Sequence, residues 1–188
     1  MIHLMKYINL ILYILLSIFF SSNSFPNEKI ISELQKGGNI IFIRHALAPG
    51  NGDPENIDLR DCATQRNLDD RGIEQSKKIG EFFKKNNIPI DKVLSSEWCR
   101  CKDTAKYAFK NFETFYGLNS FYDEKFYEFK ENQITALKNY INDWDSTKNL
   151  VLVTHYVVII ELMNLGVSSG ELAVSKKNYQ LIGTIETM

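Results

Sequence analysis

The sequence has little cysteine and almost no excess charge, and each shortage excludes a class of function. Its 22 basic and 23 acidic residues leave a formal net charge of −1 at pH 7, so no nucleic-acid partner is indicated. The doublets Lys77-Lys78 and Lys84-Lys85 are too short for a polyanion site and are predicted to lie on the solvated face of a helix. Three scattered cysteines lack the four-ligand pattern of a structural zinc site.

Long apolar runs are also rare, and the one that stands out lies in the first 24 residues. Lys6 precedes the nearly uninterrupted apolar run of residues 7–20, and Ser22 and Ser24 are small residues suited to a cleavage site. This pattern predicts a secretory signal peptide over residues 1–24, with a domain at 25–188 in the periplasm or outside the cell. The run is only slightly short of the ~17–25 residues that span a bilayer. An uncleaved anchor is therefore the alternative, and a cleaved signal would leave no stable membrane partner.

Helical and strand patterns alternate through residues 25–188. Apolar strands are expected at residues 39–43, at a short segment that begins at Val93, and at residues 149–154. Helices are expected at about 26–36, 69–86, 98–109, 134–144 and 157–163. Residues 172–174 and 179–185 are expected to pair as a hairpin. Strands alternating with helices predict an α/β three-layer sandwich with a largely parallel sheet. Residues 46–67 form a long loop, and the aromatic-rich residues 111–131 are expected to form a small cap.

Two histidines follow the two clearest apolar strands. His45 comes directly after residues 40–44, and His155 comes directly after residues 150–154. In α/β sheets, ligands bind beyond the carboxyl ends of the strands. Arg44 beside His45, and Arg100 after the strand that begins at Val93, need anionic partners if they are buried, and a guanidinium matches phosphate oxygens. These four side chains predict a pocket for a phosphate dianion.

Four segments in order resemble the histidine phosphatase (phosphoglycerate-mutase-like) superfamily. Arg44-His45 resembles its Arg-His-Gly signature, with Ala46 in place of glycine, and residues 68–75, 95–105 and 151–155 resemble its later motifs. Details at 48–54, 62–67 and 98–101 further resemble an exported branch that includes periplasmic lipopolysaccharide-core heptose phosphatases. The resemblance implies a phosphomonoesterase that acts on a phosphorylated small molecule, glycan or lipopolysaccharide component.

The resemblance also assigns roles within the pocket. His45 would attack phosphorus, while Arg44, Arg100 and His155 would hold the phosphoryl oxygens, so that no metal or other cofactor is required. Tyr156 follows His155, so the aspartate that donates a proton from that position in many relatives is missing. Asp53 is our predicted donor because a Gly-Asp-Pro turn can fix it beside His45. The other candidate carboxylates are Asp58, Asp61, Glu97, Asp123, Glu124 and Glu128.

The cysteines suggest one disulfide and one buried thiol in an oxidising compartment. Cys99 and Cys101 are too close to bridge within a helical turn, so Cys62 should pair with one of them. The family motif usually has a small buried residue at position 101, which favours Cys62–Cys99. Two other functions stay open: a mutase, which would need a more closed pocket, and a non-catalytic module that binds phosphorylated ligands.

Overall fold

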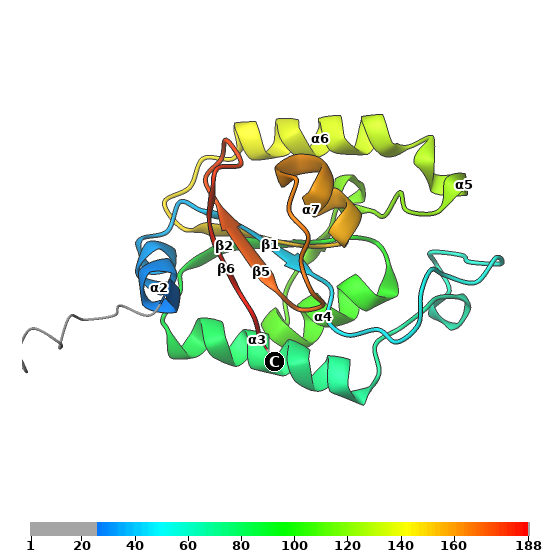
Figure 1. Cartoon of the computed structure of the whole chain (residues 1–188), viewed down its shortest axis with the longest axis horizontal. Helices are drawn as coiled ribbons and strands as arrows, with labels where there is room; N and C mark the ends of the chain where they lie inside the picture. The colour runs from blue at the N-terminus through cyan, green and yellow to red at the C-terminus, as the bar shows by residue number, and fades with distance from the viewer. Residues whose placement is uncertain (1–25, 188) are drawn as a thin grey trace, which may run out of the picture.

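The computed structural model describes residues 26–187, so the predicted signal segment 1–24 lies outside the described residues. A six-stranded sheet in the order β3-β2-β4-β1-β5-β6 forms the centre of the molecule (Figure 1). Its strands are β1 (Ile40–Arg44), β2 (Ile90–Ser95), β3 (Glu113–Thr114), β4 (Asn149–Thr154), β5 (Leu172–Ser175) and β6 (Leu181–Ile185). The first four in chain order pair in parallel, whereas β5 is antiparallel to both β1 and β6.

Helices cover both faces of the sheet. In Figure 1, α3 (Asp70–Lys85) runs along one face and α6 (Lys130–Asp143) along the other, with the sheet between them. The helices α2 (Pro26–Lys36) and α4 (Cys99–Phe109) lie with α3, and α7 (Tyr156–Met163) lies with α6. Because side chains alternate along a strand, β1 feeds both cores. Ile41 and Ile43 pack toward α3, while Ile40 and Phe42 pack toward α6.

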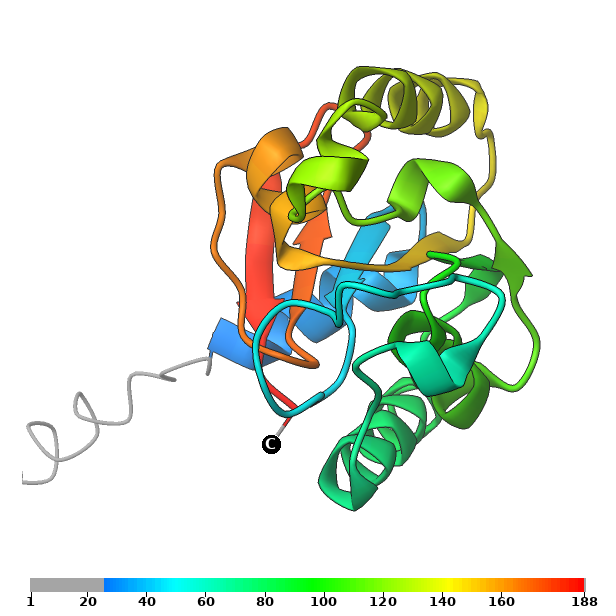
Figure 2. The ribbon, with the colours of Figure 1, turned by 90° about the vertical axis from the view of Figure 1, so that its right-hand side faces the viewer.

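The register of the sheet brings the two strand-end histidines together. Arg44 of β1 lies opposite Thr154 of β4, so His45 and His155 follow the ends of neighbouring parallel strands. The backbone N–H of His45 donates to the carbonyl of Thr154 at 2.9 Å. The long loop 46–67 lies at this edge, which faces the viewer in Figure 2.

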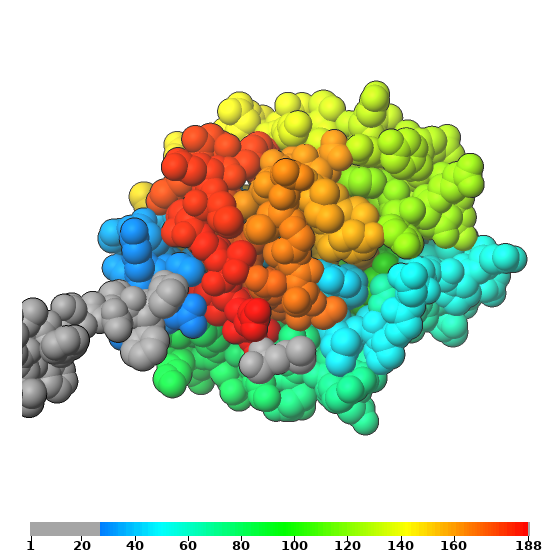
Figure 3. All heavy atoms as spheres, viewed as in Figure 1, coloured from blue at the N-terminus to red at the C-terminus, as the bar shows by residue number. Residues whose placement is uncertain are grey.

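The predicted α/β sandwich and its largely parallel sheet are confirmed, including the hairpin of β5 and β6. The segment predicted to form the cap contains short elements that the sequence did not indicate: β3, which joins the edge of the central sheet, the 3-10 turn η2 (Tyr116–Leu118) and the short helix α5 (Glu124–Tyr127). Lys125 Nζ of α5 donates to the carbonyl of Glu55 at 2.9 Å, so the cap meets the long loop (Figure 3). Within residues 26–187 no helix is both long and apolar enough to cross a membrane.

Candidate active site

A cavity of about 260 Å³ opens at the carboxyl ends of β1, β2 and β4. It is lined by all five residues predicted for the site: Arg44, His45, Asp53, Arg100 and His155. His45 and His155 are each only 2% exposed, and their ring centroids lie 5.4 Å apart. The long loop and the cap supply most of the remaining wall, which Trp98, Tyr156 and Ser169 complete. The structure therefore brings together residues that are up to 111 positions apart in the sequence.

The backbone fixes the tautomer of His45. Its Nδ1 lies 2.8 Å from the carbonyl oxygen of Ala46, and because a carbonyl can only accept, Nδ1 must carry the proton. The lone pair of the neutral ring is therefore on Nε2. Burial, followed by the charge of Arg100, holds the pKa of His45 well below its ordinary value, so the ring stays neutral. A neutral imidazole with a free Nε2 is the form that can act as a nucleophile.

His155 is held through its other ring nitrogen. Its Nε2 lies 2.9 Å from Ser96 Oγ, which lies 3.1 Å from Asn119 Oδ1. Asn119 Oδ1 also accepts from the backbone N–H of Glu97, so the Ser96 hydroxyl donates to Asn119 and accepts the Nε2 proton of His155. Burial, then the charge of Arg100, lowers the pKa of His155 well below its ordinary value. The imidazole is thus neutral, with its Nδ1 lone pair 3.5 Å from an Arg100 nitrogen.

Three arginines line the cavity, one more than the predicted pair. The half-buried Arg44 donates to the carbonyl of Val167 at 2.8 Å, and its guanidinium lies 5.3 Å from the ring centre of Tyr156. The third is Arg66 of the long loop, which donates to the carbonyls of Ala48 and Gly52. In the sequence, position 66 stood out only as part of a family resemblance. Its charge in a Gly- and Pro-rich loop was the signal that could have singled it out.

Asp53 does not have the surroundings of a proton donor. Both of its oxygens accept from the guanidinium of Arg100, at 2.8 and 3.0 Å, and it accepts further from the Arg66 backbone and the Trp98 indole. Burial raises its pKa, but the hydrogen bonds and charge of Arg100 outweigh this and the net pKa lies below the ordinary value. Asp53 is therefore ionised in this arrangement. This argues against the donor role that we predicted, and the pairing orients Arg100 instead.

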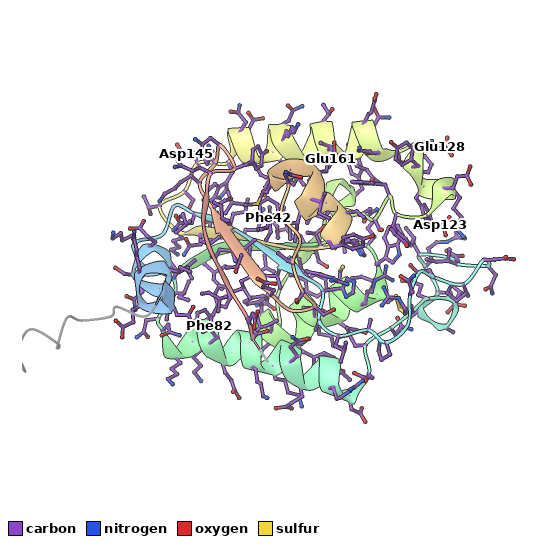
Figure 4. All side chains as sticks on the ribbon, in the orientation of Figure 1. Phe42, Phe82, Asp123, Glu128, Asp145 and Glu161 are labelled. Atoms are coloured by element: carbon purple, nitrogen blue, oxygen red, sulfur yellow. A yellow bond between two sulfur atoms is a disulfide. The ribbon has the colours of Figure 1, made fainter. Side chains whose placement is uncertain are left out.

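Asp123 is the other carboxylate on the cavity wall. It is the N-cap of α5, where its side chain accepts from the backbone N–H of Lys125 at 3.3 Å. In Figure 4 it lies at the edge of the cap that faces the long loop, whereas Glu128 lies higher on the cap. The remaining candidates do not line the cavity. Glu124 is the first residue of α5, Asp58 pairs with Arg60, Asp61 caps a turn and Glu97 accepts from Asn119 at 2.6 Å.

A disulfide joins the long loop to α4 beside the cavity. Cys62 and Cys99 form a disulfide with a Cα–Cα distance of 5.7 Å, which confirms the predicted pairing. The bond ties the long loop to the first residue of α4, next to Arg100. Cys101 is the free, buried cysteine, and burial raises its thiol pKa to about 12. Its sulfur lies 3.4 Å from His155 Nε2, so it packs against the site as a neutral thiol.

Several motif residues support the site without lining it. Thr104 Oγ1 accepts a hydrogen bond from the backbone N–H of Ala46. The side chain of Gln75 accepts from the backbone N–H of Leu47 and donates to the carbonyl of Ser169. A Cβ on Gly72 would lie 2.0 Å from the carbonyl oxygen of Leu47, so only glycine lets α3 approach this strand exit. No group of three or more potential metal-ligating side chains occurs among residues 26–187.

Comparison with known proteins gives a family pattern over part of the chain and a shared fold over most of it. Residues 40–118 match the model of the histidine phosphatase superfamily (branch 1). A comparison with curated proteins found no match.

Three of the solved structures with a similar fold illustrate its range. The protein histidine phosphatase SixA, solved with tungstate, is 14% identical, with a TM-score of 0.56 over 79% of this chain and 97% of its own. SixA from Agrobacterium tumefaciens is 18% identical, with a TM-score of 0.53 over 79% of this chain and 98% of its own. Phosphoglycerate mutase from Thermus thermophilus is 14% identical, with a TM-score of 0.54 over 79% of this chain and 98% of its own. The match to the family model is confined to residues 40–118, and over the rest of the chain the likeness to these structures is one of fold.

Proposed function

We propose that the chain is a phosphomonoesterase that works through a phosphohistidine on His45. Its substrate is a phosphorylated small molecule, glycan or lipopolysaccharide component outside the cytoplasm. The observation that carries the proposal is the tautomer of His45: its Nδ1 proton is committed to Ala46, which leaves the Nε2 lone pair in a cavity lined by three arginines. The fold shared with SixA, a histidine phosphatase, supports the same reaction class.

The reaction follows from these positions. The Nε2 lone pair of His45 forms a bond to phosphorus as the bond from phosphorus to the leaving oxygen breaks. Arg44 and Arg100 offset the charge on the phosphoryl oxygens, and a bound dianion would raise the pKa of His155 and favour its protonated, donating form. Water then attacks phosphorus, the N–P bond breaks, and inorganic phosphate leaves with His45 regenerated.

Asp123 supplies the proton that the leaving oxygen needs. It shares the cavity wall with His45, and no arginine bonds to it among the contacts of the described residues, in contrast to Asp53. In the first step it donates its proton to the departing alkoxide, and in the second it accepts one from the attacking water.

The covalent intermediate provides the test. Rapid quenching of the enzyme with a radiolabelled phosphate ester should trap a protein adduct that is labile in acid and stable in base. His45→Asn keeps a donor for the Ala46 carbonyl but has no nucleophilic nitrogen, so it should lose both adduct and turnover. Label that persists on His45→Asn would contradict the assignment of the nucleophile.

One observation favours a second candidate, the non-catalytic binding module. The guanidinium of Arg100 is already paired with Asp53, so part of its positive charge is offset within the protein itself. The same experiment separates the candidates: a binding module forms no adduct, an esterase releases inorganic phosphate, and a mutase returns an isomeric phosphate ester.

The proposed location outside the cytoplasm is supported by the Cys62–Cys99 disulfide, because such bonds persist mainly in oxidising compartments. Thiol titration of unreduced, denatured protein recovered from the periplasm of an expressing bacterium should find one free thiol, that of Cys101. Three free thiols would contradict the location.

A further inference from the structure

A second hollow of about 650 Å³ lies beside the catalytic cavity, between the long loop, the N-cap of α4, η2, α5 and α6, and we refer to it as the side groove. Trp98 and Phe126 line both the groove and the cavity. Their rings meet edge to face with centroids 5.0 Å apart, and this pair forms the shared wall. A ligand whose phosphate lies near His45 could therefore extend past Phe126 into the groove.

The side groove has a chemistry opposite to that of the cavity. None of its eleven lining residues is charged, whereas three arginines and two aspartates line the cavity. Two exposed aromatic rings offer flat apolar surfaces: Tyr116 is 49% exposed and Phe129 is 46% exposed. Carboxamides supply most of the polar lining, from Asn119, Asn132, Gln133 and Asn139. Each carboxamide presents both a donor and an acceptor.

Gln133 adds an independent sign of a missing partner. Its side chain is 5% exposed, and its Oε1 has no hydrogen-bond partner among the described residues. Leaving a buried acceptor unpaired costs about 1–3 kcal/mol, and native proteins seldom do so. A ligand that brings a hydroxyl donor to this carboxamide would remove that cost.

We propose that the side groove binds a neutral sugar ring that is joined to the phosphorylated part of the substrate. Sugar hydroxyls donate and accept, as carboxamides do, and the apolar face of the ring can pack against Tyr116 or Phe129. An acyl chain would cover the carboxamides of Asn132, Gln133 and Asn139 without giving them partners, and a charged peptide would find no counter-charge in the groove lining. This inference rests on the proposed function, because it assigns the organic part of the same substrate.

The test compares one substrate that fills only the cavity with one that reaches the groove. Acetyl phosphate is the small substrate, and trehalose 6-phosphate carries a second, neutral ring. Phe129→Ala and Asn132→Ala should each lower kcat/KM for trehalose 6-phosphate by about tenfold, the scale of one lost binding contact. Both variants should leave acetyl phosphate within about twofold, as no groove contact is involved. Tyr107→Ala, which removes an exposed aromatic of α4 outside the groove lining, is the matched control.

Two results would overturn the inference. The first is that Phe129→Ala and Asn132→Ala hydrolyse trehalose 6-phosphate as fast as wild type does. The second is that these variants lose activity only toward a lysophosphatidate or a phosphoserine peptide assayed in parallel. If the wild type fails to hydrolyse acetyl phosphate, the proposed function fails instead. Binding of unphosphorylated trehalose, detected by saturation-transfer NMR and weakened in Phe129→Ala, then decides on the groove without any turnover.

Discussion

Asp53 and Asp123 both line the cavity, but their surroundings give them different chemistry. Asp53 is clamped by Arg100 through two hydrogen bonds, and the two side chains are only 10% and 4% exposed. A carboxylate in this position is held in its charged form, so its effect on the reaction passes through the orientation of Arg100. Asp123 caps a four-residue helix through a single backbone contact, and no guanidinium hydrogen bond to its side chain is found within residues 26–187.

These surroundings predict that the loss of activity depends on the leaving group in one variant and not in the other. Asp123→Asn preserves the helix cap but removes the acid, so kcat for an alkyl phosphate should fall by about 10²–10⁴ while an aryl phosphate, whose leaving group needs no proton, changes little. Asp53→Asn loosens Arg100, so kcat/KM should fall by a similar factor for both esters. Steady-state kinetics on the two substrates measures the difference, with Glu124→Gln as the control for a neighbouring exposed carboxylate.

Stability provides a second readout for the same pair of variants. Breaking the buried Asp53–Arg100 pair should cost about 3–5 kcal/mol of unfolding free energy in urea, whereas Asp123→Asn should stay close to wild type. A leaving-group-dependent loss in Asp53→Asn, with none in Asp123→Asn, would restore Asp53 as the acid.

At the scale of elements, the strands and the residues at their carboxyl ends could be predicted from the sequence. Uninterrupted apolar runs predict parallel strands buried on both faces, and the ends of such strands share one edge of the sheet. His45, His155 and Arg100 were placed together on that argument, and the structure brings them to one cavity. The pairing of Cys62 with Cys99 relied on the family motif, since spacing alone left Cys101 as an alternative.

The cap could not be predicted in the same way. Its elements are two to four residues long, too short for periodicity to show, and their positions depend on tertiary contacts such as the one between Lys125 and Glu55. The roles of Asp53 and Asp123 depend on those contacts. A turn motif suggested that Asp53 was near His45, but no local signal indicated that Arg100 would occupy both of its oxygens.

For the molecule as a whole, the site carries a cost that depends on pH. Burial, followed by the charge of Arg100, lowers the pKa of both His45 and His155 well below the value they have in the unfolded chain. Above pH 7 both rings are neutral in the folded and the unfolded state, so they add no pH dependence. As the pH falls below about 6.5, the two histidines bind protons in the unfolded chain but stay neutral in the folded chain. Folding therefore becomes less favourable.

This linkage predicts that the free energy of unfolding decreases between pH 7 and pH 5, by at most about 2 kcal/mol for each histidine. Urea titrations in phosphate-free buffer measure it, because bound phosphate would alter the pKa of His155. Asp53 remains ionised throughout this interval, since its pKa is lowered, and so adds no slope. His45→Asn cannot take up a proton, so it should lose only about half as much stability as wild type over the same interval. Equal losses in the variant and the wild type would show that His45 is not held neutral by the fold, and would remove the basis for its role as the nucleophile.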